Sequence, residues 1–198
     1  MQKQLIGIAA ILFAGAALAQ AVPAGYPADY AQTIAAANKE GKVVIYSALD
    51  TKAAKPLISD FEAAYPGIKV EYNDMNSTEM YNRFIAEAAS NQSGADVMWS
   101  SAMDLQVKLV DEGHALAYAS PEASKLPGWA VYKGEAWGTT YEPAVIIYNK
   151  RLVTADEVPH DHAALVKLLN AKPDKFKGKV TTYDIEKSGV GFMFVVQD

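Results

Sequence analysis

The sequence predicts an α/β fold, with a parallel sheet covered by helices on both faces and a second α/β body after it. Three observations support this prediction. Short runs rich in β-branched residues alternate with stretches of helical apolar spacing, and this unit occurs three times between residues 42 and 113. Residues that favour helix caps follow each run. A further set of strand-like and helix-like stretches begins near residue 137, after an irregular segment.

Residues 1–19 have the pattern of a secretory signal peptide. Lys3 lies in a short polar start, residues 5–18 form an apolar run, and Ala17 and Ala19 are small residues at the positions that signal peptidase reads. The run is shorter than the roughly 20 residues needed to cross a bilayer. We therefore expect cleavage after Ala19 and export to the periplasm rather than a membrane anchor.

The composition excludes several classes of protein. The 198 residues include no cysteine, so no disulfide forms and no lipid is attached through a cysteine. The 23 acidic residues outnumber the 18 basic ones, and no basic tract with interleaved aromatics occurs. A nucleic-acid partner is therefore not expected.

The first predicted unit consists of a strand at residues 42–46 (KVVIY) and the helix behind it. Asp50 or Thr51 is suited to cap this helix, and Pro56 lies in its first turns, where a missing N–H costs little. The dipeptide at 66–67, Pro-Gly, ends it. The apolar stripe of this helix consists of Leu57, Ile58, Phe61, Ala64 and Tyr65.

The second and third units follow the same plan. Residues 68–72 (IKVEY) alternate as a strand does, and residues 76–79 resemble a cap with a glutamate three residues on. Residues 96–99 (DVMW) form the third predicted strand. Ser101 with Asp104 predicts a capping box for the next helix, which ends near residue 113 at a glycine.

The second body is predicted from shorter signals. We expect an extended segment from residue 137, a buried strand at 144–148, a helix at 163–169 capped by Asp161, and a strand at 179–183. An apolar stretch at 192–196 then requires further chain to pack against. The sequence therefore predicts a first body that is largely complete and a second body that is truncated.

Small polar residues follow the predicted strands where a parallel sheet places its ligand site. Free N–H groups, helix dipoles and hydroxyls at such junctions favour an anion or an oxygen-rich solute. The alternative is that each residue is an ordinary helix cap, since these residue types lead at all N-caps. The candidate ligand-binding residues are Ser47, Asp50, Ser77, Thr78, Ser100, Ser101, Tyr141, Asp184, Ser188 and Gly189.

Catalytic and metal-binding patterns are weak. His160 and His162 flank Asp161, but their spacing does not suit one helix face and no third ligand lies nearby in the sequence. The segment 188–191 (SGVG) lacks the order of a nucleophile elbow, and three scattered histidines make a triad implausible. We expect no enzyme activity, no metal and no cofactor. A secreted α/β hydrolase is the competing class, and a purely structural protein without a cleft is the third.

The order of several motifs resembles the extracellular solute-binding proteins of ABC importers, in the branch that includes ferric-ion-binding proteins and relatives that bind phosphorylated or carboxylated solutes. Each motif is loose alone, but together they span almost the whole chain after residue 19. They occupy residues 43–47, 61–70, 94–97, 141–149, 176–180 and 184–191.

The resemblance implies a two-lobed, type II periplasmic binding fold with the solute held between the lobes and an inner-membrane permease as partner. The first lobe would cover residues 20–142, and a hinge strand and partial second lobe would cover 143–198. A monomer is expected. The ferric members use a ligand just after the first strand, here near Asp50, and a late tyrosine pair. No adjacent tyrosines occur in this sequence, so ferric iron is the alternative ligand.

Overall fold

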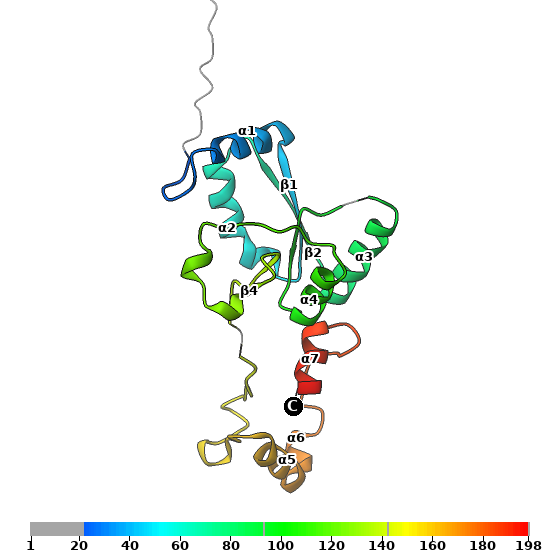
Figure 1. Ribbon diagram of the computed structural model, residues 1–198. Coiled ribbons are helices and arrows are strands. Elements are labelled where there is room, and N and C mark those ends of the chain that lie inside the picture. Colours follow the sequence, from blue (N-terminus) through cyan, green and yellow to red (C-terminus); the bar gives the residue numbers. More distant parts are fainter. Residues whose placement is uncertain (1–21, 93, 142, 198) are drawn as a thin grey trace, which may run out of the picture.

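The computed structural model describes residues 22–92, 94–141 and 143–197 (Figure 1). Its centre is a three-stranded parallel sheet in the order β2-β1-β3, which confirms the predicted sheet. The strands are β1 (Lys42–Ser47), β2 (Lys69–Asp74) and β3 (Val97–Trp99). The predicted signal peptide at 1–19 lies outside the described residues.

Helices connect these strands as the alternation of the sequence predicts. Helix α2 (Thr51–Ala64) joins β1 to β2, α3 (Ser77–Ala89) joins β2 to β3, and α4 (Met103–Asp111) follows β3. Helix α1 (Tyr30–Glu40) precedes β1 and has no counterpart among the predicted elements. It ends at Gly41, whose φ of 76° is a left-handed conformation that glycine adopts without strain.

The core of the first lobe lies between the sheet and α3. Val44, Tyr46 and Met80 form a buried cluster. The Tyr46 hydroxyl donates to Glu87 at 2.9 Å, and the Arg83 guanidinium lies 4.4 Å from the ring centroid. Burial, with the hydrogen bond to Glu87, raises the pKa of Tyr46. The phenol therefore remains a neutral donor inside the lobe.

Three of the predicted helix caps are confirmed. The carboxylate of Asp50 accepts from the Lys52 N–H at 2.7 Å, and Asp161 accepts from the Ala164 N–H at 2.6 Å. Asn76 accepts from the Glu79 N–H at 2.8 Å. Each of these caps depends on residues at most three positions apart, so the local sequence indicates them.

The predicted capping box at Ser101 is wrong. Helix α4 begins at Met103, and Ala102 occupies its N-cap without a side-chain bond. The Ser100 hydroxyl instead accepts from the Ala102 N–H at 3.1 Å. The Met103 N–H donates to the Ser101 carbonyl at 2.9 Å, so Ser101 lies in the turn before the N-cap position and the helix starts later.

The part of the chain after α4 has little regular structure until α5. A hairpin pairs β4 (Val131–Tyr132) with β5 (Ala136–Trp137) in antiparallel fashion. The remaining elements are the 3₁₀ turns η1 (Ala123–Lys125), η2 (Gly128–Ala130) and η3 (Ala155–Glu157), and the helices α5 (His162–Ala171), α6 (Pro173–Phe176) and α7 (Gly189–Gln197).

Two predicted strands of the second lobe are absent. Residues 144–148 and 179–183 form no regular structure, and the predicted burial of 144–148 is also wrong, because Val145 is 70% and Ile147 88% exposed. A β-strand requires a neighbouring strand for its backbone hydrogen bonds. Within the described residues, neither 144–148 nor 180–183 forms a backbone–backbone hydrogen bond.

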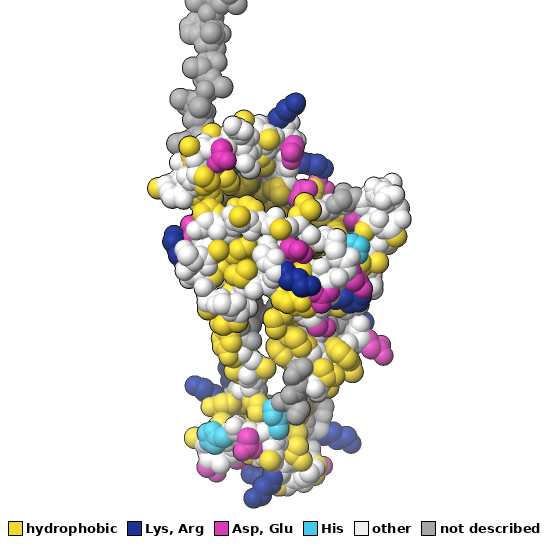
Figure 2. All heavy atoms as spheres, in the orientation of Figure 1, with side chains coloured by type: hydrophobic (Ala, Val, Ile, Leu, Met, Phe, Trp, Pro, Cys, Tyr) yellow, Lys and Arg dark blue, Asp and Glu magenta, His cyan; other side chains and the backbone are white. Residues whose placement is uncertain are grey.

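The segments η3, α5 and α6 form a small lower body (Figure 1), in which Phe176 is buried and charged side chains are paired. Lys175 forms an ion pair with Glu157 at 2.6 Å, and Lys172 contacts the same carboxylate. Helix α7 lies apart from this body, directly under α3 and α4, with contacts to both (Figure 1). Figure 2 shows hydrophobic side chains gathered on the two connections between the upper lobe and the lower body. Within the described part of the chain, no helix combines the length and hydrophobicity of a membrane crossing.

Candidate ligand-binding site

The carboxyl ends of the three parallel strands meet at the edge of the sheet that faces α7. Ser47, the last residue of β1, is paired with Asp74 of β2 and with Trp99 of β3. The chain then turns into α2, α3 and α4, so the N-termini of these helices gather at this edge. This is the position at which open α/β sheets bind ligands.

A cavity of about 300 Å³ lies between this edge and the segment around α7. Residues of both parts of the chain line it, and the described lining residues include neither acidic nor basic side chains. The wall combines polar residues with apolar and aromatic ones. The lining residues are Ala48, Asn76, Ser77, Ser101, Pro143, Tyr183, Ser188, Val190 and Phe194.

Ser77 joins the two parts of the chain at this cavity. Its side chain is buried at 4% exposure, and its hydroxyl oxygen accepts a hydrogen bond from the Gly189 N–H at 3.0 Å. A Cβ at Gly189 would lie 3.2 Å from Leu105 and 3.3 Å from Ala102. Glycine is therefore what allows the first turn of α7 to approach α3 and α4 so closely.

Ser188 lies directly before Gly189, and its bond is local to α7. Its hydroxyl oxygen accepts from the Gly191 N–H at 3.0 Å and so caps the start of α7. A serine hydroxyl has one hydrogen to donate beside its acceptor lone pairs. Because Ser77 and Ser188 each accept from the backbone, their hydroxyl hydrogens remain to be donated into the cavity.

The other polar lining residues, Asn76 and Ser101, differ in whether their side chains already form hydrogen bonds within the protein. Asn76 accepts from the Glu79 N–H, and its amide donates to the Glu79 carboxylate at 3.2 Å, so it is largely occupied as a cap. Ser101 is exposed, and its side chain forms no hydrogen bond with any described residue. Its hydroxyl is therefore free for a ligand.

A second, more open hollow of about 550 Å³ lies beside the first. Asn76 borders both hollows, whereas Thr78 lines only this one. Its walls include Glu79 and Glu186 as well as Arg83 and Lys187, so both signs of charge are present. Such a wall offers no selectivity for an anion over a cation.

Three of the candidate residues have structural roles next to the cavity rather than in its wall. Ser47 is fully buried, and its hydroxyl accepts from the Leu49 N–H at 3.0 Å. Asp50 caps α2, and Ser100 stabilises the turn before α4. All three shape the ends of the strands without lining the cavity.

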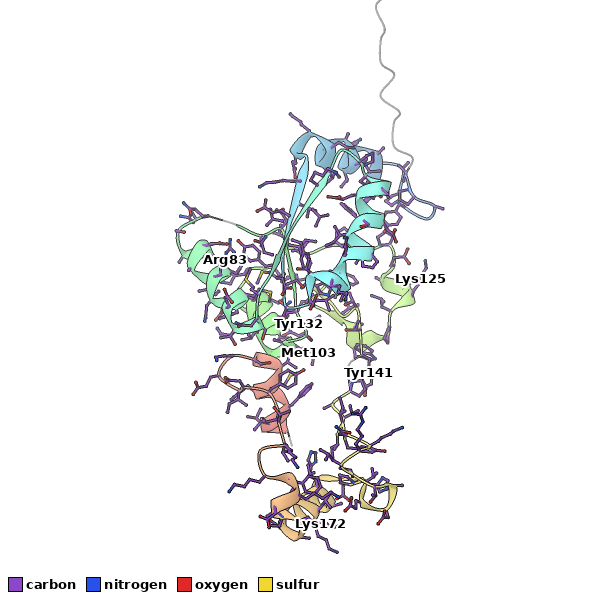
Figure 3. All side chains as sticks on the ribbon, turned by 180° about the vertical axis from the view of Figure 1, so that it is seen from behind. Arg83, Met103, Lys125, Tyr132, Tyr141 and Lys172 are labelled. Carbon is purple, nitrogen blue, oxygen red and sulfur yellow. The ribbon has the colours of Figure 1, made fainter. Side chains whose placement is uncertain are left out.

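The two remaining candidates lie outside the cavity wall. Tyr141 is 81% exposed, and its ring centroid lies 6.3 Å from that of Trp129 (Figure 3). Asp184 accepts from the Glu186 N–H at 3.0 Å and forms an ion pair with Lys187 at 3.5 Å. The backbone hydrogen bond from Glu186 and the charge of Lys187 lower the pKa of Asp184, which therefore remains an anion.

The structure thus brings together Ser77, Ser101, Ser188 and Gly189 of the candidate set. Sequence reasoning missed Tyr183, Val190 and Phe194, because their place in the wall depends on how α7 docks. The one available signal was the apolar stretch after Ser188, which indicates a packed segment but not the surface that it faces.

The histidines lie away from this site. His114, His160 and His162 are exposed, and none lines the cavity. Among the residues that the structure describes, no group of three histidine or carboxylate side chains is placed to hold a metal ion.

Comparisons with known proteins show the family of the chain. The profile of the family described as bacterial extracellular solute-binding protein matches residues 46–184. The crystal structure of the substrate binding protein of the ABC transporter from Agrobacterium tumefaciens is similar, with 40% sequence identity and a TM-score of 0.75. The similarity covers 79% of this chain and 46% of that one, so this chain spans about half the length of the solved relative. No protein of curated function matches the chain.

Proposed function

Because the chain belongs to the family of bacterial extracellular solute-binding proteins, we propose that it is the solute-binding component of an ABC importer. It binds a small anionic, oxygen-rich solute, such as a phosphorylated or carboxylated compound, in the cavity beneath α3 and α4. It then presents the solute to an inner-membrane permease. Residues 20–142 supply one wall of the site and residues 143–198 supply the other.

The observation that supports an anionic solute is that two serine hydroxyls in the wall still have a hydrogen to donate. Ser77 and Ser188 both accept backbone N–H bonds, which leaves each with a hydrogen to donate. Ser101 offers a further hydroxyl. The N-terminal end of α7 adds partial positive charge at the same place. A cavity with donors and no described carboxylate in its wall suits oxyanions.

Binding without catalysis is the better explanation of these residues. A hydrolytic serine needs a base within hydrogen-bond reach. Ser77 and Ser188 instead accept from backbone N–H groups, and the described wall, which also includes Ser101, contains no histidine. The family and the solved relative are solute-binding proteins of transport systems, which favours the same conclusion.

A thermal-shift screen of residues 20–198 tests the proposal. The probes are inorganic phosphate, glucose 6-phosphate, citrate and ferric citrate, each over a concentration series. A ligand at 100 times its dissociation constant adds about 2.7 kcal/mol to the free energy of unfolding. We expect stabilisation by at least one iron-free anion. The variant S188A should weaken it, whereas S124A, which changes an exposed serine in η1, should not.

Two results would overturn the assignment. Stabilisation by ferric citrate alone, with a tyrosinate charge-transfer absorption band, would identify an iron-binding protein. Absence of any shift with all four probes, in a chain that circular dichroism shows to be folded, would remove the anion proposal.

A further inference from the structure

Two exposed aromatic side chains lie close to the candidate cavity without lining it. Trp129, in η2, is 66% exposed, and Tyr141, where the upper lobe passes into the connection to the lower body, is 81% exposed (Figure 3). Their ring centroids are 6.3 Å apart, and their planes are inclined at 60°. Solvent therefore reaches most of both rings. These two side chains are called the aromatic ledge below.

The Trp129 ring has a defined position on the surface. The Gly138 N–H donates to the Ala130 carbonyl at 2.7 Å, which holds the end of the hairpin against η2. A Cβ at Gly138 would lie 3.4 Å from Cζ3 of Trp129 and 3.3 Å from the Cα of Ala130. Because Gly138 has no side chain, the edge of the indole packs against the backbone there. A surface that is fixed before a ligand arrives loses less entropy on binding.

The aromatic ledge is connected to the cavity through the backbone. Tyr141 is two positions from Pro143, which lines the cavity. Two residues span at most about 7 Å between their Cα atoms. A solute that is held by the serine hydroxyls and extends past Pro143 therefore meets the ledge.

The aromatic ledge has polar groups at its edges as well as apolar faces. Neither the Tyr141 hydroxyl nor the Trp129 indole N–H forms a hydrogen bond with any described residue. The indole N–H donates, and the phenol both donates and accepts. A sugar ring carries C–H groups on its faces and hydroxyls around its rim, so it matches both features. A flat aromatic ligand held between two rings would need them parallel, and the inclination of 60° does not provide this.

We propose that the aromatic ledge is a sugar-binding subsite of the candidate site, and that the solute is a phosphorylated or carboxylated sugar in its ring form. The inference rests on the proposed function, because the cavity has to hold the anionic group for the ring to reach the ledge. The hydroxyls of the cavity bind the charge. The ledge selects cyclic over linear anions through apolar contact with the C–H groups of the ring.

The test compares cyclic and linear compounds that carry the same anionic group. Glucose 6-phosphate is paired with glycerol 3-phosphate, and glucuronate with glycerate. Each compound is titrated into residues 20–198 by isothermal calorimetry. We expect at least one cyclic compound to bind tenfold or more tightly than its linear counterpart. The same compound should shift the tryptophan emission to shorter wavelength, because its ring displaces water from Trp129.

Four substitutions locate the effect. W129A and Y141A should each raise the dissociation constant of the cyclic compound at least fivefold and leave that of the linear compound within twofold. W129F, which retains an aromatic face, should recover most of the affinity. Y118A is the matched control, because Tyr118 is 50% exposed and lies 6.5 Å from Trp137 in a second tyrosine–tryptophan pair. It should change neither constant.

Three outcomes would overturn the inference. The first is equal affinity for cyclic and linear compounds. The second is an equal loss of affinity for both kinds of compound in W129A and Y141A, in chains that circular dichroism shows to be folded. Neither of these bears on the anion site itself. The third is that none of the four compounds binds although inorganic phosphate stabilises the chain, in which case the anion site stands and the ledge binds no sugar.

Discussion

The hydroxyl oxygen of Ser77 accepts a hydrogen bond from the backbone N–H of Gly189 at 3.0 Å, in a buried position that joins residues 112 apart in the sequence. Ser77 opens α3, and Gly189 opens α7. The first turns of two helices from different parts of the chain are therefore held together at the wall of the candidate site. A single side chain thus links the fold of the first lobe to the placement of α7.

Replacing Ser77 by alanine should loosen this link. The variant S77A leaves the Gly189 N–H buried without an acceptor, which costs about 1–3 kcal/mol. We expect faster hydrogen exchange at Gly189 and a lower free energy of unfolding in urea. S124A, at an exposed position in η1, should change neither. Unchanged protection of Gly189 in S77A would show that other contacts hold α7.

Adding a methyl group at Gly189 should have a related effect by a different cause. In G189A the new Cβ would lie 3.2 Å from Leu105 and 3.3 Å from Ala102, which is closer than normal packing. Overpacking of this kind costs about 1–3 kcal/mol. G128A is the matched control, because a Cβ at Gly128 meets no atom within 4 Å. Urea denaturation of both variants checks the prediction, and equal midpoints would contradict it.

Glu157 should make the stability of the lower body depend on pH. Its side chain is 8% exposed and contacts two lysines. The hydrogen bonds from Lys172 and then Lys175 hold the pKa of Glu157 well below its ordinary value. A lowered folded-state pKa contributes stability that is complete above the ordinary pKa of about 4.3 and is lost as the pH falls below it.

The variant E157Q tests this dependence. The free energy of unfolding of the unchanged chain should fall between pH 6 and pH 3, and E157Q should be less stable at pH 6 and lose less over that interval. E40Q, at an exposed carboxylate without an ion pair among the described residues, should keep the slope of the unchanged chain. Parallel pH curves for E157Q and the unchanged chain would show that the two lysines do not stabilise the native state through Glu157.

The features that the sequence predicts correctly are those that neighbouring residues determine. Asp50, Asn76 and Asp161 cap helices within three residues of themselves, and the parallel sheet follows from the alternation of strand and helix patterns. The predicted strand at 144–148 fails because strand formation needs a partner, and composition does not reveal one. The wall of the cavity could not be predicted either, because it also depends on contacts between distant parts of the chain. Tyr183 and Phe194 line it only because α7 docks against α3 and α4.

Ser101 offers a way to separate ligand binding from folding. Its hydroxyl lines the cavity but bonds to no described residue, whereas the hydroxyls of Ser77 and Ser188 also hold α7 in place. S101A should therefore leave the free energy of unfolding without ligand within about 0.5 kcal/mol of the unchanged chain. S188A should lower it by about 1 kcal/mol through loss of the α7 cap.

Both variants should bind an anion more weakly. A hydrogen bond to a charged group contributes about 1.5–3 kcal/mol, so the dissociation constant should rise at least tenfold for each. Isothermal titration with the anion that gives the largest thermal shift measures this rise. Unchanged affinity in S101A, with weaker binding in S188A, would place the solute nearer to α7 than to α4. Unchanged affinity in both variants would show that the anion binds outside this cavity.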